Sequence, residues 1–150
     1  MNDDDDGPGY PRVLVSNRAT EAPELDESAL AELARTTLLA EGRDRVELSL
    51  SFVDDAEIAE LHERYMQEHG PTDVLTFPLD DADERGVELL GDVVIAPGVA
   101  ARNNPADPDS ELRLLVVHGV LHALGYDHES DDERAEMWAR QERYSGVTVP

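Results

Sequence analysis

Apolar and polar residues alternate most clearly between residues 46 and 52 of the chain. Every second position there is apolar, and Glu47, Ser49 and Ser51 stand between them. A period of two predicts a half-buried β-strand. Residues 12–17 predict a short first strand, and residues 89–96, which are apolar through their second half, predict a central one. Residues 71–78 predict a turn and a short buried strand closed by Pro78, followed by an acidic loop over residues 79–88.

Helices are predicted between these strands from apolar stripes of helical period and from capping residues. They begin, in chain order, at Asp26, at Asp54 or Asp55, at Pro97, at Asp109 or Ser110, and at Ser130. Ser130 and Glu133 have the spacing of a capping box. No internal repeat or linker divides the chain. Together, these strands and helices predict an α+β fold, in which a small mixed β-sheet packs with helices and one central helix presents histidines.

Three histidines lie within eleven residues, in the pattern H-x3-H-x5-H. His118 and His122 are four residues apart on the predicted helix, so their imidazoles face the same side. Gly125 can adopt the left-handed conformation that ends a helix, which returns His128 toward the other two. Three imidazoles around one divalent ion leave a fourth position for water, as at catalytic zinc sites. The spacing predicts one Zn²⁺ per chain, or another divalent metal, on His118, His122 and His128.

The histidines also fit a structural role or a protease. A histidine on an apolar helix face can be a core residue with a satisfied hydrogen bond. The spacing also equals that of the zinc-protease motif H-E-x-x-H-x-x-G-x-x-H. Gly119, however, stands where those proteases carry the glutamate that acts as general base, which argues against peptide hydrolysis by that mechanism.

The amino-acid composition limits the metal ligands and the partners that this site can have. The 150 residues contain no cysteine, which excludes disulfide-linked partners and thiolate metal ligands. Asp and Glu number 35 against 12 basic residues, all arginine, for a formal net charge of −23. The acids are spread through every segment, which favours a surface adapted to concentrated salt over one that binds a basic protein partner.

The first residues predict a leader without regular structure. Residues 1–11 are rich in Asp, Gly and Pro, and lack both the apolar core of an export signal and the basic residues of a transit peptide. No run approaches the roughly 18 apolar residues that span a membrane. We therefore expect an acidic, disordered leader over residues 1–11, a single domain over residues 12–150, and a cytoplasmic protein.

Three motifs, within roughly residues 46–144, resemble those of the bacterial YbeY family of metal-dependent endoribonucleases. The most specific is residues 118–129, HGVLHALGYDHE, continued by Asp132, Glu136 and Met137. The second is PTDVLTFP at residues 71–78, and the third is GDVVIAP at residues 91–97. The resemblance implies an enzyme specific for single-stranded RNA that acts in rRNA maturation, including 16S rRNA 3′-end processing, and in ribosome quality control. Its implied partners are ribosomal RNA and the ribosome or its proteins.

The roles of the other site residues are less constrained. Asp127, beside His128, is a candidate general base or a carboxylate that orients the histidine. Thr72 and Asp73 are candidate substrate-binding residues, although either could simply serve the turn and strand there. Tyr65 or Phe77 could stack on RNA bases. A ribosome assembly factor with a structural zinc and a metalloprotease-like hydrolase are the alternative functions.

One position departs from the family pattern. Similar members commonly carry an arginine after an aromatic residue just before the Pro-Thr-Asp element, and here Met66 follows Tyr65. Arg64, two residues away, would face another side of a helix. Arg102 or Arg113 could approach the site from elsewhere in the chain.

Overall fold

A mixed β-sheet is the scaffold of the computed structural model, which describes residues 9–20, 25–66 and 73–147. Within these ranges the sheet has four strands, β1 (Arg12–Asn17), β2 (Val46–Phe52), β3 (Val74–Ala82) and β4 (Glu88–Ile95), in the order β1-β2-β4-β3. β1 runs parallel to β2 and β2 to β4, whereas β3 is antiparallel to β4. The predicted α+β class with a mixed sheet is confirmed, and so is the interior place of β4.

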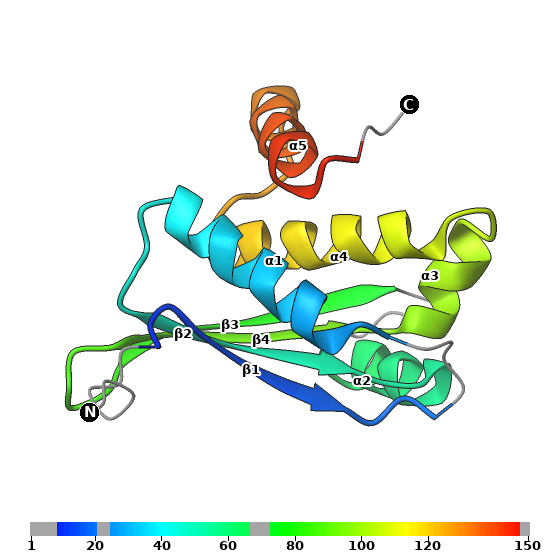
Figure 1. Cartoon of the computed structure of the whole chain (residues 1–150), viewed down its shortest axis with the longest axis horizontal. Coiled ribbons are helices and arrows are strands. Elements are labelled where there is room, and N and C mark those ends of the chain that lie inside the picture. The colour runs from blue at the N-terminus through cyan, green and yellow to red at the C-terminus, as the bar shows by residue number, and fades with distance from the viewer. Residues whose placement is uncertain (1–8, 21–24, 67–72, 148–150) are drawn as a thin grey trace.

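The helices divide between the two faces of the sheet (Figure 1). Helices α1 (Glu27–Ala40) and α4 (Pro108–Ala123) cover one face, and α5 (Asp131–Ser145) packs on α1 and α4 from outside. Helix α2 (Asp55–Met66) lies on the opposite face, and the short α3 (Pro97–Asn103) joins β4 to α4. Helix α4 is therefore the central helix, enclosed by the sheet, α1 and α5.

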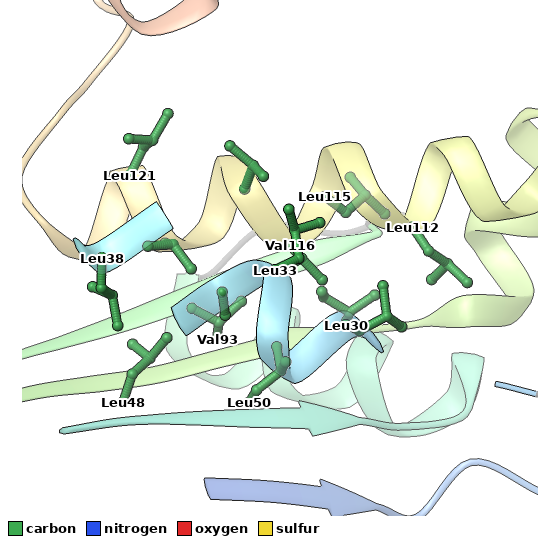
Figure 2. Close-up of a cluster of buried hydrophobic side chains, with 14 of the residues drawn as sticks. Leu30, Leu33, Leu38, Leu48, Leu50, Val93, Leu112, Leu115, Val116 and Leu121 are labelled. Atoms are coloured by element: carbon green, nitrogen blue, oxygen red, sulfur yellow. The ribbon is translucent and has the colours of Figure 1, made fainter. Parts of the chain in front are cut away.

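The main hydrophobic core lies between the sheet and helices α1 and α4 (Figure 2). The alternating residues of β2 point into it, and Leu48, Leu50 and Phe52 are fully buried, as the period of two predicts. Leucines at positions 30, 33 and 38 supply the α1 side. Because α4 is covered on several sides, its apolar residues form a continuous run rather than one stripe. A smaller cluster, including Ile58, Leu75 and Val94, lies beneath α2.

Two predicted boundaries are wrong. Strand β3 continues past Pro78 to Ala82 and pairs with the start of β4, so part of the predicted acidic loop over residues 79–88 is a hairpin. β3 is an edge strand, where a proline is tolerated because one side makes no ladder hydrogen bonds. Helix α4 begins at Pro108, and its N-cap is Asp107, whose side chain accepts from the Ser110 N–H at 3.2 Å. Proline at the first helical position makes this start favourable.

Residues 1–8 of the predicted leader lie outside the described residues. Arg35 on α1 donates hydrogen bonds to the carbonyl oxygens of Pro11, at 3.2 Å, and Tyr10, at 3.5 Å. None of the helices in the described ranges is both long enough and apolar enough to cross a membrane.

Candidate metal centre

The three histidines converge at the C-terminal end of α4. His118 and His122 are one turn apart on the helix, and Gly125, at a φ of +108°, turns the chain so that His128 folds back. The imidazole centroids are 5.9 Å apart for His118 and His122, 5.7 Å for His118 and His128, and 5.9 Å for His122 and His128. The structure thus brings together the three predicted ligands in a nearly equilateral triangle.

Hydrogen bonds to two of the rings fix which nitrogen is left to bind a metal. The Nδ1–H of His118 donates to Oε1 of Gln141 at 2.8 Å, and the Nδ1–H of His122 donates to the backbone carbonyl of Tyr126 at 2.8 Å. Both partners are acceptors, so the proton sits on Nδ1 and the lone pair of a neutral ring is on Nε2. This is the outer support that metal-binding histidines require.

Burial lowers the pKa of His118, and the neighbouring His122 and His128 lower it further, while the hydrogen bond to Gln141 acts in the opposite direction. The ring is therefore kept neutral, which is the form that binds a metal. His122, Asp127 and His128 form a set whose ligand atoms lie within 4.8 Å of one another and could hold a metal ion; His118 is not part of that set, although its ring centroid is 5.9 and 5.7 Å from those of His122 and His128. Asp127 thus stands close enough to the histidines to be a ligand as well as a base.

The Asp127 carboxylate is held in place by the loop itself. Its Oδ1 accepts from the backbone N–H of His128 at 2.7 Å. That hydrogen bond is the largest cause of the lowered pKa of Asp127. The side chain is therefore ionised at neutral pH, in the form that accepts a proton or orients a cationic or metal-bound neighbour.

Gly119 lies between the histidines on α4 and faces the sheet rather than the metal centre. A Cβ placed there would approach Cγ1 of Val93 to 2.4 Å. The glutamate that zinc proteases carry at this position would collide with β4, because the helix packs too closely on the strand. The close approach explains the glycine and weakens the protease interpretation.

Helix α5 contributes residues that sequence reasoning did not assign to the site. Gln141 is buried and holds His118, and the Trp138 ring lies edge-on to His118 and His128, with centroids 6.0 and 5.6 Å away. Gln141 follows Met137 by one helical turn, on the buried face of α5. A polar amide one turn after the apolar Met137 was the available signal for this contact. No sequence signal could indicate the contact of the Tyr126 carbonyl, because every residue has a backbone carbonyl.

Of the two candidate substrate-binding residues, only Asp73 lies in the part of the chain that the structure describes. Thr72 lies outside the described residues. Asp73, the residue before β3, accepts a hydrogen bond from Nδ2 of Asn103 at 3.2 Å and lines a pocket together with His118. Tyr65 and Phe77 contact each other at 5.5 Å between centroids, but they lie under the sheet beside α2, on the face opposite the histidines.

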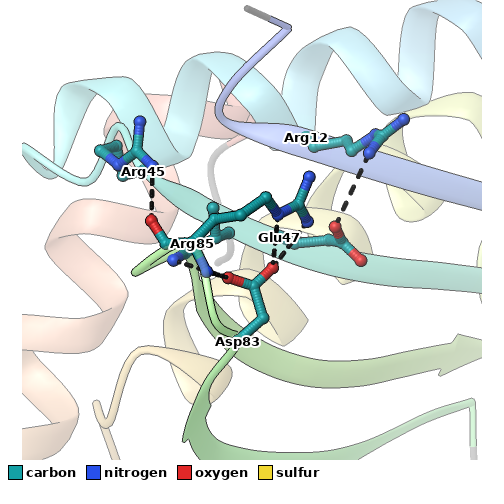
Figure 3. Close-up of polar contacts among 6 residues, drawn as sticks. Arg12, Arg45, Glu47, Asp83 and Arg85 are labelled. Atoms are coloured by element: carbon teal, nitrogen blue, oxygen red, sulfur yellow. Dashed lines mark hydrogen bonds and ion pairs between the residues drawn. The ribbon is translucent and has the colours of Figure 1, made fainter. Parts of the chain in front are cut away.

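All twelve arginines have partners within the structure. Most of them form ion pairs with carboxylates: Arg12, Arg18, Arg43, Arg64, Arg85, Arg102, Arg134 and Arg140. The others donate to backbone carbonyls, as Arg35, Arg45 and Arg113 do, or lie over a ring, as Arg143 does. Figure 3 shows such contacts at the β3–β4 hairpin, where Arg85 binds Asp83 at 2.6 Å and Arg45 donates to the Arg85 carbonyl at 2.9 Å.

None of the arginines considered as substitutes at position 66 is directed at the histidines. Arg64 pairs with Glu60, Arg102 with Asp55, and Arg113 with the carbonyl of Ser145. Arg134 of α5 is the arginine that does contact the site, through a 3.4 Å hydrogen bond to the carbonyl of His128.

Comparisons with known proteins agree with this arrangement. The family model described as Endoribonuclease YbeY matches residues 15–146. Similar proteins named Endoribonuclease YbeY come from Frankia casuarinae (46% identical over 142 residues, covering 86% of this chain and 70% of the relative) and Streptomyces coelicolor (45% over 134 residues, covering 79% of each). The solution structure of a Thermotoga maritima protein matches with a TM-score of 0.57 and 30% identity, covering 89% of this chain and 86% of that one. This chain belongs to the YbeY endoribonuclease family.

Proposed function

We propose that this protein is a metal-dependent endoribonuclease that cleaves single-stranded ribosomal RNA. The observation that carries the proposal is the triangle of imidazoles, with centroids 5.7–5.9 Å apart and two of the rings held by their Nδ1–H groups. Membership of an endoribonuclease family supports the reaction class. The half-buried histidines between α4 and α5 suit an unpaired strand, which can adapt its backbone to the site better than a duplex can.

His118, His122 and His128 would hold the metal, and Zn²⁺ suits three neutral imidazoles best, although other divalent ions accept the same donors. When bound, such an ion lowers the pKa of its water to about 7 and polarises a phosphoryl oxygen. Gln141 and the Tyr126 carbonyl would keep the rings in the ligating tautomer. Asp127 would either accept the proton of the attacking water or orient His128. Its place close to His122 and His128 supports the two roles equally.

The proposal extends to the biological setting. Processing of the 3′ end of 16S rRNA and ribosome quality control would be the roles of the enzyme, with the ribosome or its proteins as partners, in the cytoplasm. Residues 12–150 would form one catalytic domain. The family match over residues 15–146 supports this extent.

A second candidate is a ribosome assembly factor in which the metal only stabilises the fold. It is favoured by Met66 in place of the family arginine and by the engagement of all twelve arginines with other groups. A metalloprotease is disfavoured because Gly119 packs on Val93 and no glutamate fits there.

The deciding experiment compares the metal-quantified protein with His122→Ala and, as a control, His62→Ala on α2 at the other face of the sheet. Each is incubated with ribosomal RNA at high salt, and the products are mapped. We expect cleavage by the wild type and the control, and its loss together with the bound metal in His122→Ala. Intact RNA from a fully metallated wild type would favour the assembly factor.

A further inference from the structure

A pocket of about 230 Å³ adjoins His118. It lies between the start of β3, the side of α4 that carries His118, and helix α5. Asp73, Glu111 and Trp138 line it, with Val74, Leu114 and Gln141 completing the walls. Because His118 belongs both to this pocket and to the candidate metal centre, a group bound here would adjoin that centre.

The polar atoms that face the pocket from Asp73 and Glu111 are hydrogen-bond acceptors. The Asp73 carboxylate receives one hydrogen bond, from Asn103. The Glu111 carboxylate receives none from the part of the chain that the structure describes. Burial and then the charge of Asp73 raise the pKa of Glu111, so the ionised form of Glu111 is disfavoured in this pocket. N–H donors from a ligand would relieve both, because ionised carboxylates only accept.

An aromatic and apolar wall completes the pocket. The half-buried indole of Trp138 is fixed edge-on against His118 and His128. Leu114 and Val74 add apolar surface. Flat apolar walls with a few fixed polar groups are typical of sites that bind an unstacked nucleobase, which is read through the hydrogen bonds of its pairing edge.

Other occupants fit less well. A phosphate group would meet two carboxylates and no arginine. A metal ion is less favoured, because the set of residues in the described ranges whose ligand atoms lie close enough to hold one is His122, Asp127 and His128, and neither Asp73 nor Glu111 belongs to it.

We propose that this pocket binds an unpaired guanine of the RNA substrate, next to the phosphate that is cleaved. This inference rests on the proposed function. Guanine carries two adjacent N–H donors on its pairing edge, N1–H and the N2 amino group, which match two carboxylate acceptors. Uracil presents one N–H between two carbonyl oxygens, which carboxylates repel. Adenine and cytosine each place a ring acceptor beside their amino group.

The first test changes the RNA and leaves the protein intact. Short single-stranded RNAs are made with guanosine at the mapped cleavage site or with inosine there, which lacks only the N2 amino group. For the wild type we expect kcat/KM to fall about tenfold with inosine, the effect of one hydrogen bond to a charged acceptor. In the Asp73→Asn/Glu111→Gln variant, whose amide oxygens still accept but carry no charge, we expect the preference for guanosine to fall to roughly twofold to threefold. The ratio within each protein cancels the change in net charge, and Glu60→Gln on α2 is the matched control that keeps the tenfold preference.

The second test needs no cleavage, because Trp138 is the only tryptophan of the chain. Guanosine 5′-monophosphate should change its fluorescence saturably, and uridine 5′-monophosphate should not. The double variant should bind the guanine nucleotide at least about tenfold more weakly, the same loss expected for one hydrogen bond to a charged acceptor. Retained metal content and an unchanged circular dichroism spectrum would show that it remains folded.

The two tests separate this inference from the proposed function. A protein that cleaves RNA without distinguishing guanosine from inosine is an endoribonuclease whose pocket does not read guanine. A protein that binds the guanine nucleotide selectively but cleaves no RNA has the pocket and lacks the activity. Equal fluorescence changes with both nucleotides, or a change produced only by added magnesium, would overturn the inference.

Discussion

Glu41, just after α1, connects that helix to the loop and helix that complete the metal centre. Its carboxylate accepts from the hydroxyl of Tyr126 at 2.8 Å, from the hydroxyl of Tyr144, and from Arg140 at 2.6 Å. Only 7% of the Glu41 side chain is exposed. The backbone carbonyl of Tyr126 in turn holds His122. We predict that Glu41→Gln destabilises the fold and loosens the metal centre together.

The expected loss follows from the number of donors. Hydrogen bonds to a charged group contribute about 1.5–3 kcal/mol each, and breaking a buried ion pair costs about 3–5 kcal/mol. Glutamine keeps one acceptor oxygen, and Arg140 is 28% exposed and retains Glu136, so it is not left without a partner. We therefore expect a loss of about 2–4 kcal/mol in the free energy of unfolding. For a chain of this size this corresponds to a fall in Tm of roughly 5–15 °C.

The pH dependence gives an independent check. Burial acts to raise the pKa of Glu41, but the hydrogen bonds from Tyr144, Tyr126 and Arg140 outweigh it and lower the pKa below its usual value. A carboxyl group with a lowered pKa in the folded state stabilises the protein above its unfolded pKa, near 4.3, and this contribution is lost as the pH falls through the folded pKa. The difference in stability between wild type and Glu41→Gln should therefore be full at pH 7 and shrink in acid.

Urea unfolding at pH 7 and at several lower pH values measures both effects. Glu136→Gln is the control, since it removes the exposed partner of Arg140 and should cost less than about 1 kcal/mol. A Glu41→Gln protein as stable as the control at pH 7 would refute the reasoning, as would a difference that grows in acid.

Two further predictions concern the whole surface and the metal ligands. The Tm of the wild type should rise by several degrees between about 0.1 and 2 M sodium chloride, because screening weakens the repulsion of a net charge of −23; a flat or falling Tm would contradict salt adaptation. Gln141→Ala should leave the His118 ring without its acceptor and weaken zinc binding about 10–100-fold, as measured by competition with a chromophoric chelator; unchanged affinity would show that Gln141 does not position the ring.

The parts of the fold that were predicted correctly are those with local signals. The period of two in β2, the capping box of Ser130 and Glu133, and Gly125 after α4 all act within a few residues. The approach of His118 and His122 could be predicted from the pitch of a single helix. Contacts between residues far apart in the sequence could not be predicted. Glu41 is 85 residues from Tyr126, and only the packing of α1 against α4 and α5 brings them together.

The incorrect boundaries have a similar cause. Residues 79–82 are strand because β4 supplies pairing partners such as Leu89 and Glu88, which outweigh the low strand propensity of their aspartates. The start of α4 was placed too late because several residues there can cap a helix. Asp107 acts as the cap because Pro108 follows it at the first helical position.

The charge of the protein and its substrate restrict how RNA can be held. Phosphate contacts with arginine weaken steeply as salt rises, and here every arginine already has an internal partner. Contacts with bases depend on hydrogen bonds and stacking, which salt screens far less than interactions between exposed charges. An acidic enzyme working in concentrated salt would therefore gain specificity and affinity from a base pocket beside the metal centre. The carboxylates of Asp73 and Glu111, which are unfavourable for phosphate, would then suit the N–H donors of a base.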